Sequence, residues 1–134
     1  VAADKGTVDV GKNYKYLFQY LPIKKQRIDD IYLNILDELR KIQGFMLRKK
    51  YIAAKNCIQE LFILLLPQKD IIDSELLNAL LAFQKLLSSN VKAGLLGRSK
   101  CLNVSTTTEV LNNLISDLTG RISSLEKYIE KFSN

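Results

Sequence analysis

Leucine and isoleucine recur along most of the chain at intervals of three and four residues, which is the spacing of one face of an α-helix. The alternation of apolar and polar residues that is typical of strands is scarce, and only two prolines and six glycines interrupt the pattern. The sequence therefore predicts an all-α fold, an antiparallel helical bundle of four to five helices joined by short connections.

The first third of the chain is predicted to contain a leader and two helices. Residues 1–11 are small and polar without periodicity, so we expect a flexible leader, followed by a single helical-bundle domain over residues 12–134. A short amphipathic helix is predicted for residues 12–21. A second helix is predicted to begin near Pro22, because proline fits the first helical turn.

The longest apolar stripe begins at Ile28, is interrupted after Gly44 and resumes until Pro67. One long bent helix and two helices joined by a tight turn both fit this stripe. We favour a break between Gly44 and Tyr51, since an unbroken helix would far exceed the globular average of about 11–12 residues.

The next helix is leucine-rich. Asp73 or Ser74 can cap its start, and the helix is expected to end near Gly94 or Gly97. Its apolar face is so wide that we expect it to be largely enclosed.

The last helix is predicted to start at Thr106, because Thr106-x-x-Glu109 matches a capping box. Its apolar positions recur in alternating steps of four and three residues, which is typical of a helix that packs at a shallow angle on a partner. These positions are Leu111, Ile115, Leu118, Ile122, Leu125, Ile129 and Phe132.

Composition argues against catalysis. The chain has no histidine, the residue on which acid–base catalysis near neutral pH most often relies. Gly94 and Gly97 lack the spacing and the Lys-Ser/Thr pair of a phosphate-binding loop. The longest apolar run, residues 61–66, is far shorter than the roughly 20 residues of a membrane span. We expect a protein that is not an enzyme, with no cofactor and no membrane span.

A formal charge of +6 favours acidic partners. Five basic residues gather around the predicted break and are the candidate partner-binding residues, and Lys92, Arg98 and Lys100 form a smaller group. The alternative is a helix end that is basic because the helix dipole favours cations there. Nucleic-acid binding is not expected, since the tyrosine-rich segment, with Tyr14, Tyr16 and Tyr20, lies apart from these charges and has the spacing of core residues. The five are Arg40, Lys41, Arg48, Lys49 and Lys50.

Cys57 and Cys101 are the only cysteines. A disulfide between them would close a loop of about 45 residues and stabilise the fold by roughly 4 kcal/mol. The alternative is two unrelated buried thiols in a cytosolic protein. A metal site is not expected, because two cysteines without histidine do not supply four zinc ligands. Asn103 begins an Asn-x-Ser triplet and is a candidate glycosylation site.

In length, Lys/Ile/Leu-rich usage, helical stripes and the single pair Cys57 and Cys101, the whole chain resembles the anopheline mosquito salivary inhibitors of the alternative complement pathway, the albicin type. This resemblance implies a secreted, extracellular, non-enzymatic inhibitor that binds a host plasma complex, the C3 convertase. Two alternatives stay open: a carrier of a small apolar ligand, enclosed by helices as apolar as residues 76–87, and an intracellular helical scaffold or adaptor.

Overall fold

The computed structural model describes the backbone of residues 10–133 and the side chains of residues 28–127. This range is mostly helical, as predicted, with four α-helices, two short 3₁₀ helices and one two-stranded sheet. The elements in chain order are α1 (Val10–Leu47), α2 (Tyr51–Leu65), η1 (Leu66–Gln68), α3 (Ser74–Asn90), β1 (Val91–Ala93), η2 (Leu95–Gly97), β2 (Ser99–Cys101) and α4 (Val104–Ser133).

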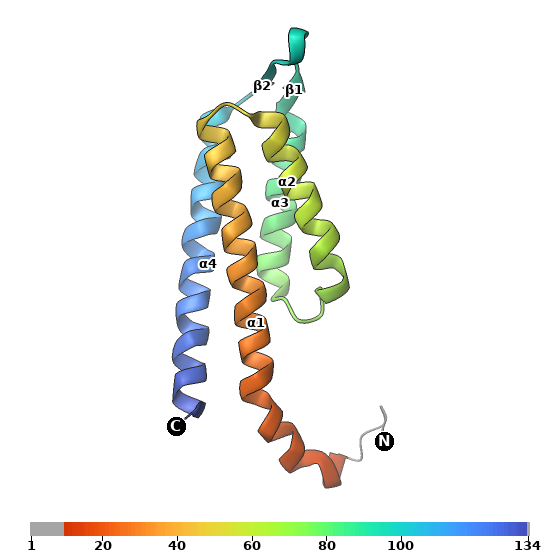
Figure 1. The fold of residues 1–134 in the computed structure, drawn as a ribbon, viewed down its shortest axis with the longest axis vertical. Coiled ribbons are helices and arrows are strands. Elements are labelled where there is room, and N and C mark those ends of the chain that lie inside the picture. The colour runs from red at the N-terminus through yellow and green to blue at the C-terminus, as the bar shows by residue number, and fades with distance from the viewer. Residues whose placement is uncertain (1–9, 134) are drawn as a thin grey trace.

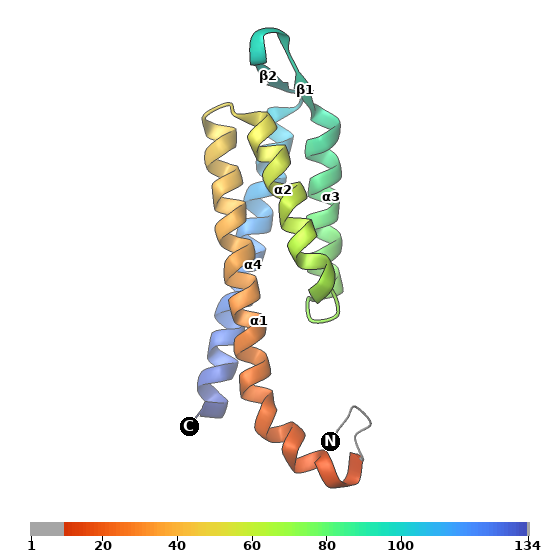
Figure 2. The same cartoon turned by 45° about the vertical axis from the view of Figure 1, so that its right-hand side comes forward.

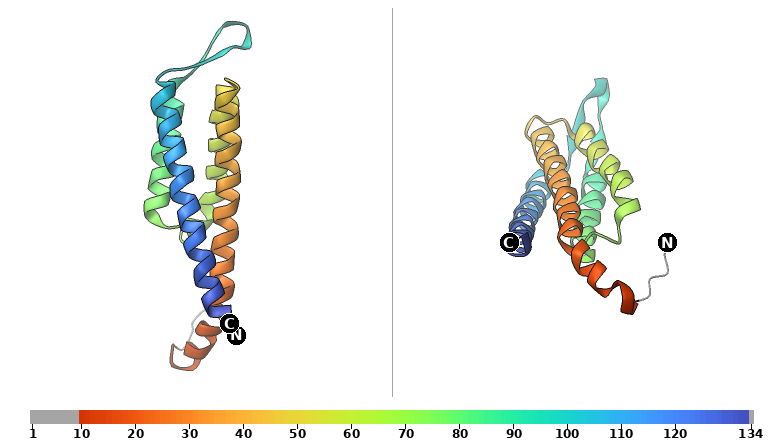
Figure 3. Two further views of the ribbon diagram at one scale, coloured as in Figure 1. Left: turned by 90° about the vertical axis from the view of Figure 1, so that its left-hand side faces the viewer. Right: turned by 60° about the horizontal axis from the view of Figure 1, so that its bottom comes forward.

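Consecutive helices run in opposite directions (Figure 1). Helix α1 packs along α4 and α2, and α3 packs against α4 and α2 (Figure 2). The β1–β2 hairpin projects beyond the helices at the end where α1 joins α2, while the first turns of α1 extend at the opposite end (Figures 1 and 3). The two ends of the molecule are therefore built from different segments.

All four helices contribute to one core. The stripes predicted on α1 and α4 face it, which confirms the helical periodicity over the described side chains. The apolar face predicted for residues 12–21, and the positions Ile129 and Phe132, lie outside those side chains. The largest fully buried apolar side chains are Ile35, Leu39, Ile42, Ile58, Leu76, Leu80, Phe83, Leu87, Leu111 and Leu118.

The apolar face of α3 is narrower than predicted. Leu80 and Phe83 are fully buried, but Leu77 is only half-buried and Leu81 is 37 % exposed. The expectation that this helix is largely enclosed was wrong, because α3 packs against α2 and α4 and leaves its remaining side to solvent.

The predicted break between α1 and α2 is confirmed. Helix α1 ends in a Schellman-type motif, in which the Lys50 N–H donates to the Phe45 carbonyl (2.8 Å) and the Lys49 N–H donates to the Met46 carbonyl (3.1 Å). Lys49 has a φ of 61°, a left-handed conformation that glycine usually occupies at this position.

We expect Lys49→Gly to raise the free energy of unfolding by about 1 kcal/mol, because glycine adopts the left-handed conformation without steric cost. Chemical denaturation would measure the gain. Lys50→Gly is the matched control, since Lys50 has a φ of −93° and glycine brings no relief there. A loss of stability in Lys49→Gly would contradict the left-handed turn.

Helix α1 is continuous, so the separate helix over residues 12–21 and the helix start near Pro22 were wrong. A proline inside a helix removes one backbone hydrogen bond and bends the helix without necessarily ending it. Figure 1 shows the first turns of α1 angled away from the rest of the helix. Val10 and Gly11, predicted to be leader, belong to α1, and the remainder of the leader lies outside the described residues.

Helix α3 ends at Asn90 and not near Gly94 or Gly97, because the chain turns into an antiparallel hairpin. Val91 is the register partner of Cys101, and Lys92 that of Lys100. A Cβ atom added to Gly94 would lie 2.7 Å from the Arg98 carbonyl oxygen, so the loop needs glycine there. Gly94 and Gly97, expected at a helix end, instead lie in this hairpin loop.

The last helix starts at Val104, so the capping box at Thr106 and Glu109 was wrong. Asn103 stands immediately before the helix with a φ of 51°. Its carbonyl accepts hydrogen bonds from both the N–H and the hydroxyl of the fully buried Thr107, each at 3.0 Å. The helix therefore begins at the sharp bend at Asn103.

Candidate functional site

The hairpin and the α1–α2 turn place six exposed basic residues at one end of the molecule (Figures 1 and 2). We call this group the cationic end. Strands β1 and β2 both contact α2, which begins directly after the turn. Within the described part of the chain, none of the six forms an ion pair with a carboxylate. The cationic end consists of Arg48, Lys49, Lys50, Lys92, Arg98 and Lys100.

The sequence around the cationic end contains no acid at all. Residues 39–59 and 76–108 hold ten lysines and arginines with no aspartate or glutamate, whereas the rest of the chain holds the other ten together with all fourteen acids. Such segregation gives the protein a field that attracts anionic surfaces to one end.

The structure divides the five predicted partner-binding residues. Arg48, Lys49 and Lys50 lie on the turn, and the Arg48 guanidinium stands 5.4 Å from the centre of the Phe45 ring. Arg40 is exposed nearly two helical turns before the end of α1.

Lys41 is compensated by an acid. Its Nζ lies 3.1 Å from Glu38 Oε2, and the hydrogen bond to Glu38, followed by its charge, raises the pKa of Lys41. From the sequence, Lys41 has equal weight with the other four, but in the structure its charge is partly compensated by Glu38.

The disulfide expected between Cys57 and Cys101 is not formed, and both are free thiols. The two sulfurs have different neighbours: Cys57 Sγ lies 4.0 Å from Glu38 Oε2 on α1, whereas Cys101 Sγ donates to the Leu102 carbonyl at 3.4 Å. Burial raises the pKa of both thiols, and the nearby Glu38 carboxylate raises that of Cys57 further. Neither thiol is activated as a nucleophile.

Asn103, the candidate glycosylation site, has a structural contact. Its Nδ2, the atom that carries a glycan in N-glycosylation, donates to Asn90 Oδ1 at 3.2 Å. Asn90 is itself buried at the end of α3. A glycan on Asn103 would have to displace this contact, and the glycosylation stays a prediction.

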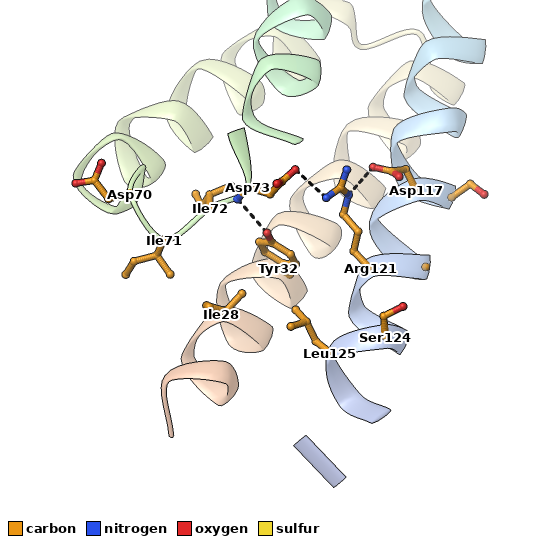
Figure 4. Close-up of a pocket in the computed structure, with 12 residues that line it drawn as sticks. Ile28, Tyr32, Asp70, Ile71, Ile72, Asp73, Asp117, Arg121, Ser124 and Leu125 are labelled. Carbon is orange, nitrogen blue, oxygen red and sulfur yellow. Dashed lines mark hydrogen bonds and ion pairs between the residues drawn. The ribbon is translucent and has the colours of Figure 1, made fainter. Parts of the chain in front are cut away.

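An open groove of about 680 Å³ lies toward the other end, between α1, α4 and the connection that leads into α3 (Figure 4). Apolar side chains from α1, α4 and this connection line it, including Ile28, Ile72 and Leu125. Along its rim, Arg121 Nη1 lies 2.9 Å from Asp73 Oδ2, and Arg121 Nε lies 2.9 Å from Asp117 Oδ2 (Figure 4).

The same rim fixes the start of α3. Asp73 caps the helix by accepting from the Leu76 N–H at 3.2 Å, as predicted, and its own N–H donates to the Tyr32 hydroxyl at 3.1 Å. Because two carboxylates already hold Arg121, this guanidinium is satisfied by the protein itself. The ion pairs therefore have a structural role.

Asp29 lies where its negative charge is unfavourable. Its Oδ1 is buried without a hydrogen-bond partner among the described residues. Burial, with the negative charges of Glu126 and Asp30, raises the pKa of Asp29. The ionised form therefore opposes folding.

We expect Asp29→Asn to raise the free energy of unfolding by about 0.5 kcal/mol near neutral pH. Because the folded pKa of Asp29 is raised, the natural chain regains this stability as the pH falls through that pKa, so the gain should vanish below about pH 3. Thermal melts of both chains across pH measure this. A gain of equal size at acid pH would show that charge is not the cause, and Asp30→Asn is the exposed control.

Residues 28–127 contain no group of three or more Cys, Asp or Glu side chains placed to hold a metal ion. None of the helices, over their described residues, is long and apolar enough to cross a membrane. No protein-family model matches the chain, and neither the curated proteins nor the solved structures yielded a match.

Proposed function

We propose that this chain is a non-enzymatic binding protein whose cationic end docks on an acidic surface of a partner protein. One observation carries this proposal: six exposed basic side chains, none of them paired with a carboxylate of the described residues, converge on one end from sequence stretches that contain no acid. Unpaired surface charges of one sign steer association with an oppositely charged partner and set its orientation.

The side chains that could support catalysis favour binding over turnover. The chain has no histidine, and the two thiols have raised pKa values. Asp29 and Asp30 are neighbours on a helix, so their carboxyl groups point in different directions.

The resemblance to the anopheline salivary inhibitors supplies the specific form of the proposal. In that form the protein is secreted and extracellular, and its cationic end binds an acidic surface of the complement C3 convertase. The absence of the disulfide removes one support for an extracellular site, and two free thiols are what the intracellular adaptor alternative predicts. Counting thiols in the unfolded natural protein separates these two.

The test of the proposal is charge reversal on the α1–α2 turn. Lys49→Glu with Lys50→Glu should weaken binding to an acidic plasma partner at least about tenfold, with little change in melting temperature. The two helix dipoles oppose each other here: a negative charge is favoured before α2 and disfavoured after α1, so the net effect on folding is small at these exposed positions. Capture from plasma followed by affinity measurement gives the result.

The matched control is Lys69→Glu with Lys127→Glu. It changes the net charge equally at exposed positions away from the cationic end. If both double variants weakened the affinity equally, the effect would come from net charge alone. If the affinity of Lys49→Glu with Lys50→Glu were unchanged, the turn would not be part of the binding surface.

The second candidate function is carriage of a small apolar ligand, and the groove beside Tyr32 favours it. The sequence allowed a carrier because residues 76–87 are so apolar, but the buried side chains of this segment pack in the core and do not line this groove. Native mass spectrometry of the purified protein, with Leu125→Gln in the groove as the comparison, would show whether ligand is retained there.

A further inference from the structure

The tip of the β1–β2 hairpin carries two leucines that the protein leaves uncovered. Leu95 is 89 % exposed and Leu96 is 96 % exposed. Single exposed leucines are ordinary, but two adjacent ones at the outermost point of a projecting hairpin form an apolar tip (Figures 1 and 3).

Two features of the hairpin oppose its own stability. Leu96 has a φ of 58°, a conformation unfavourable for leucine. Lys92 and Lys100 are register partners, and like charges directly opposite one another destabilise a strand pair. These features do not stabilise the folded hairpin. They therefore indicate a ligand that binds both the apolar and the basic side chains.

We propose that the hairpin inserts its Leu95–Leu96 tip into the interface of an anionic lipid bilayer, with the surrounding basic residues contacting lipid headgroups. This goes beyond the proposed function, because the ligand is a lipid surface and the acting residues are the leucines. The binding is peripheral, which agrees with the lack of a spanning helix among the described residues.

Shape and charge together favour a bilayer over a protein pocket. The tip projects from the molecule, and the hairpin, residues 91–101, carries three basic residues and no acid, so it matches a broad negative surface into which apolar groups can insert. An acidic protein surface would answer the basic groups alone and leave the two exposed leucines in water, whereas the bilayer interface accepts both. Insertion is shallow, since Lys92 and Arg98 lie within three residues of the leucines.

The hairpin can enter the interface without losing its backbone structure. The Gly94 N–H donates to the Arg98 carbonyl, and the Arg98 N–H donates to the Leu95 carbonyl at 3.2 Å. The loop that carries the tip is thus closed by its own hydrogen bonds, which lowers the cost of leaving water.

The test is sedimentation of the full chain with vesicles of phosphatidylcholine plus phosphatidylserine. We expect binding to these vesicles and little binding to phosphatidylcholine alone. Leu95→Gln with Leu96→Asn should weaken it at least about 30-fold, because the apolar contribution is lost. Asparagine adopts a positive φ more readily than leucine, so this variant should keep its fold.

The matched control is Ile63→Gln with Leu64→Gln. It removes two adjacent aliphatic side chains, 69 % and 62 % exposed, from the far end of α2. Vesicle binding should be unchanged in this control. Equal loss in both variants, or no loss in the tip variant, would overturn the proposal, as would failure of the natural chain to bind the anionic vesicles.

A fluorescent reporter separates insertion from surface adsorption. The chain contains no tryptophan, so Leu95→Trp provides a single probe at the tip. Its emission should shift to the blue with anionic vesicles and be quenched by brominated lipid. Binding without this shift would show adsorption by charge alone and refute insertion. If the tip variant lost binding to a plasma partner but kept vesicle binding, the lipid proposal would also be refuted. The proposed function is tested separately, by the charge reversal at Lys49 and Lys50.

Discussion

Replacing Phe83 with alanine is expected to lower the free energy of unfolding by about 3–5 kcal/mol. Phe83 is fully buried on α3 and belongs to the core that joins the helices. The loss includes both the transfer of the ring from water and the cavity left behind. A domain of this size has a total stability of about 5–15 kcal/mol, so the variant should be close to unfolding. Urea denaturation followed by far-UV circular dichroism measures the change.

Leu81→Ala is the control for this prediction. Leu81 lies on the same helix, two residues earlier, and is 37 % exposed. Its truncation should cost about 1 kcal/mol or less. If Phe83→Ala cost no more than Leu81→Ala, the packing of α3 on α2 and α4 would be incorrect.

Helical periodicity predicted which faces of α1 and α4 pack in the core. Spacing alone predicts the buried positions Leu111, Leu118 and Ile122, because a long amphipathic helix repeats its signal many times. The α1–α2 break was predicted from helix length. No residue type in the sequence indicates the left-handed Lys49 that makes the turn.

The hairpin could not be read from periodicity, because strands of three residues are too short to show alternation. Gly94 and Gly97 predicted a helix end, because glycine commonly follows the last turn of a helix. A loop containing glycine between two short β-capable segments is also typical of a hairpin. Val91 and Cys101, which pair across β1 and β2, were not recognised as strand residues.

The candidate site was predicted in part. The sequence separates Arg48–Lys50 from Lys92–Lys100 by more than forty positions, and only the fold brings the two groups to one end. The missed signal was the lack of acids around both groups. Charge segregation of this kind is readable from a sequence before any fold is known. Cysteine spacing, in contrast, does not reveal that Cys57 faces Glu38.

The base of the hairpin depends on one buried amide. Asn90 Nδ2 donates to the Leu86 carbonyl at 2.8 Å, and its Oδ1 accepts from Asn103 Nδ2 at 3.2 Å. The Asn90 carbonyl also accepts from the Leu102 N–H at 2.8 Å. This residue thereby joins the end of α3 to the chain that leaves the hairpin and enters α4, so it sets the direction in which the tip projects.

Asn90→Asp should lower the free energy of unfolding by about 2 kcal/mol at neutral pH. The carboxylate has the shape of the amide but cannot donate to the Leu86 carbonyl, and its burial at a helix C-terminus opposes ionisation. Its folded pKa should be raised above the unfolded value of about 3.9, so the penalty should shrink as the pH falls through the folded pKa. Denaturation at several pH values measures this. Asn78→Asp makes the same change at an exposed site on α3 and should have little effect, and equal losses in the two variants would refute the role of Asn90 beneath the hairpin.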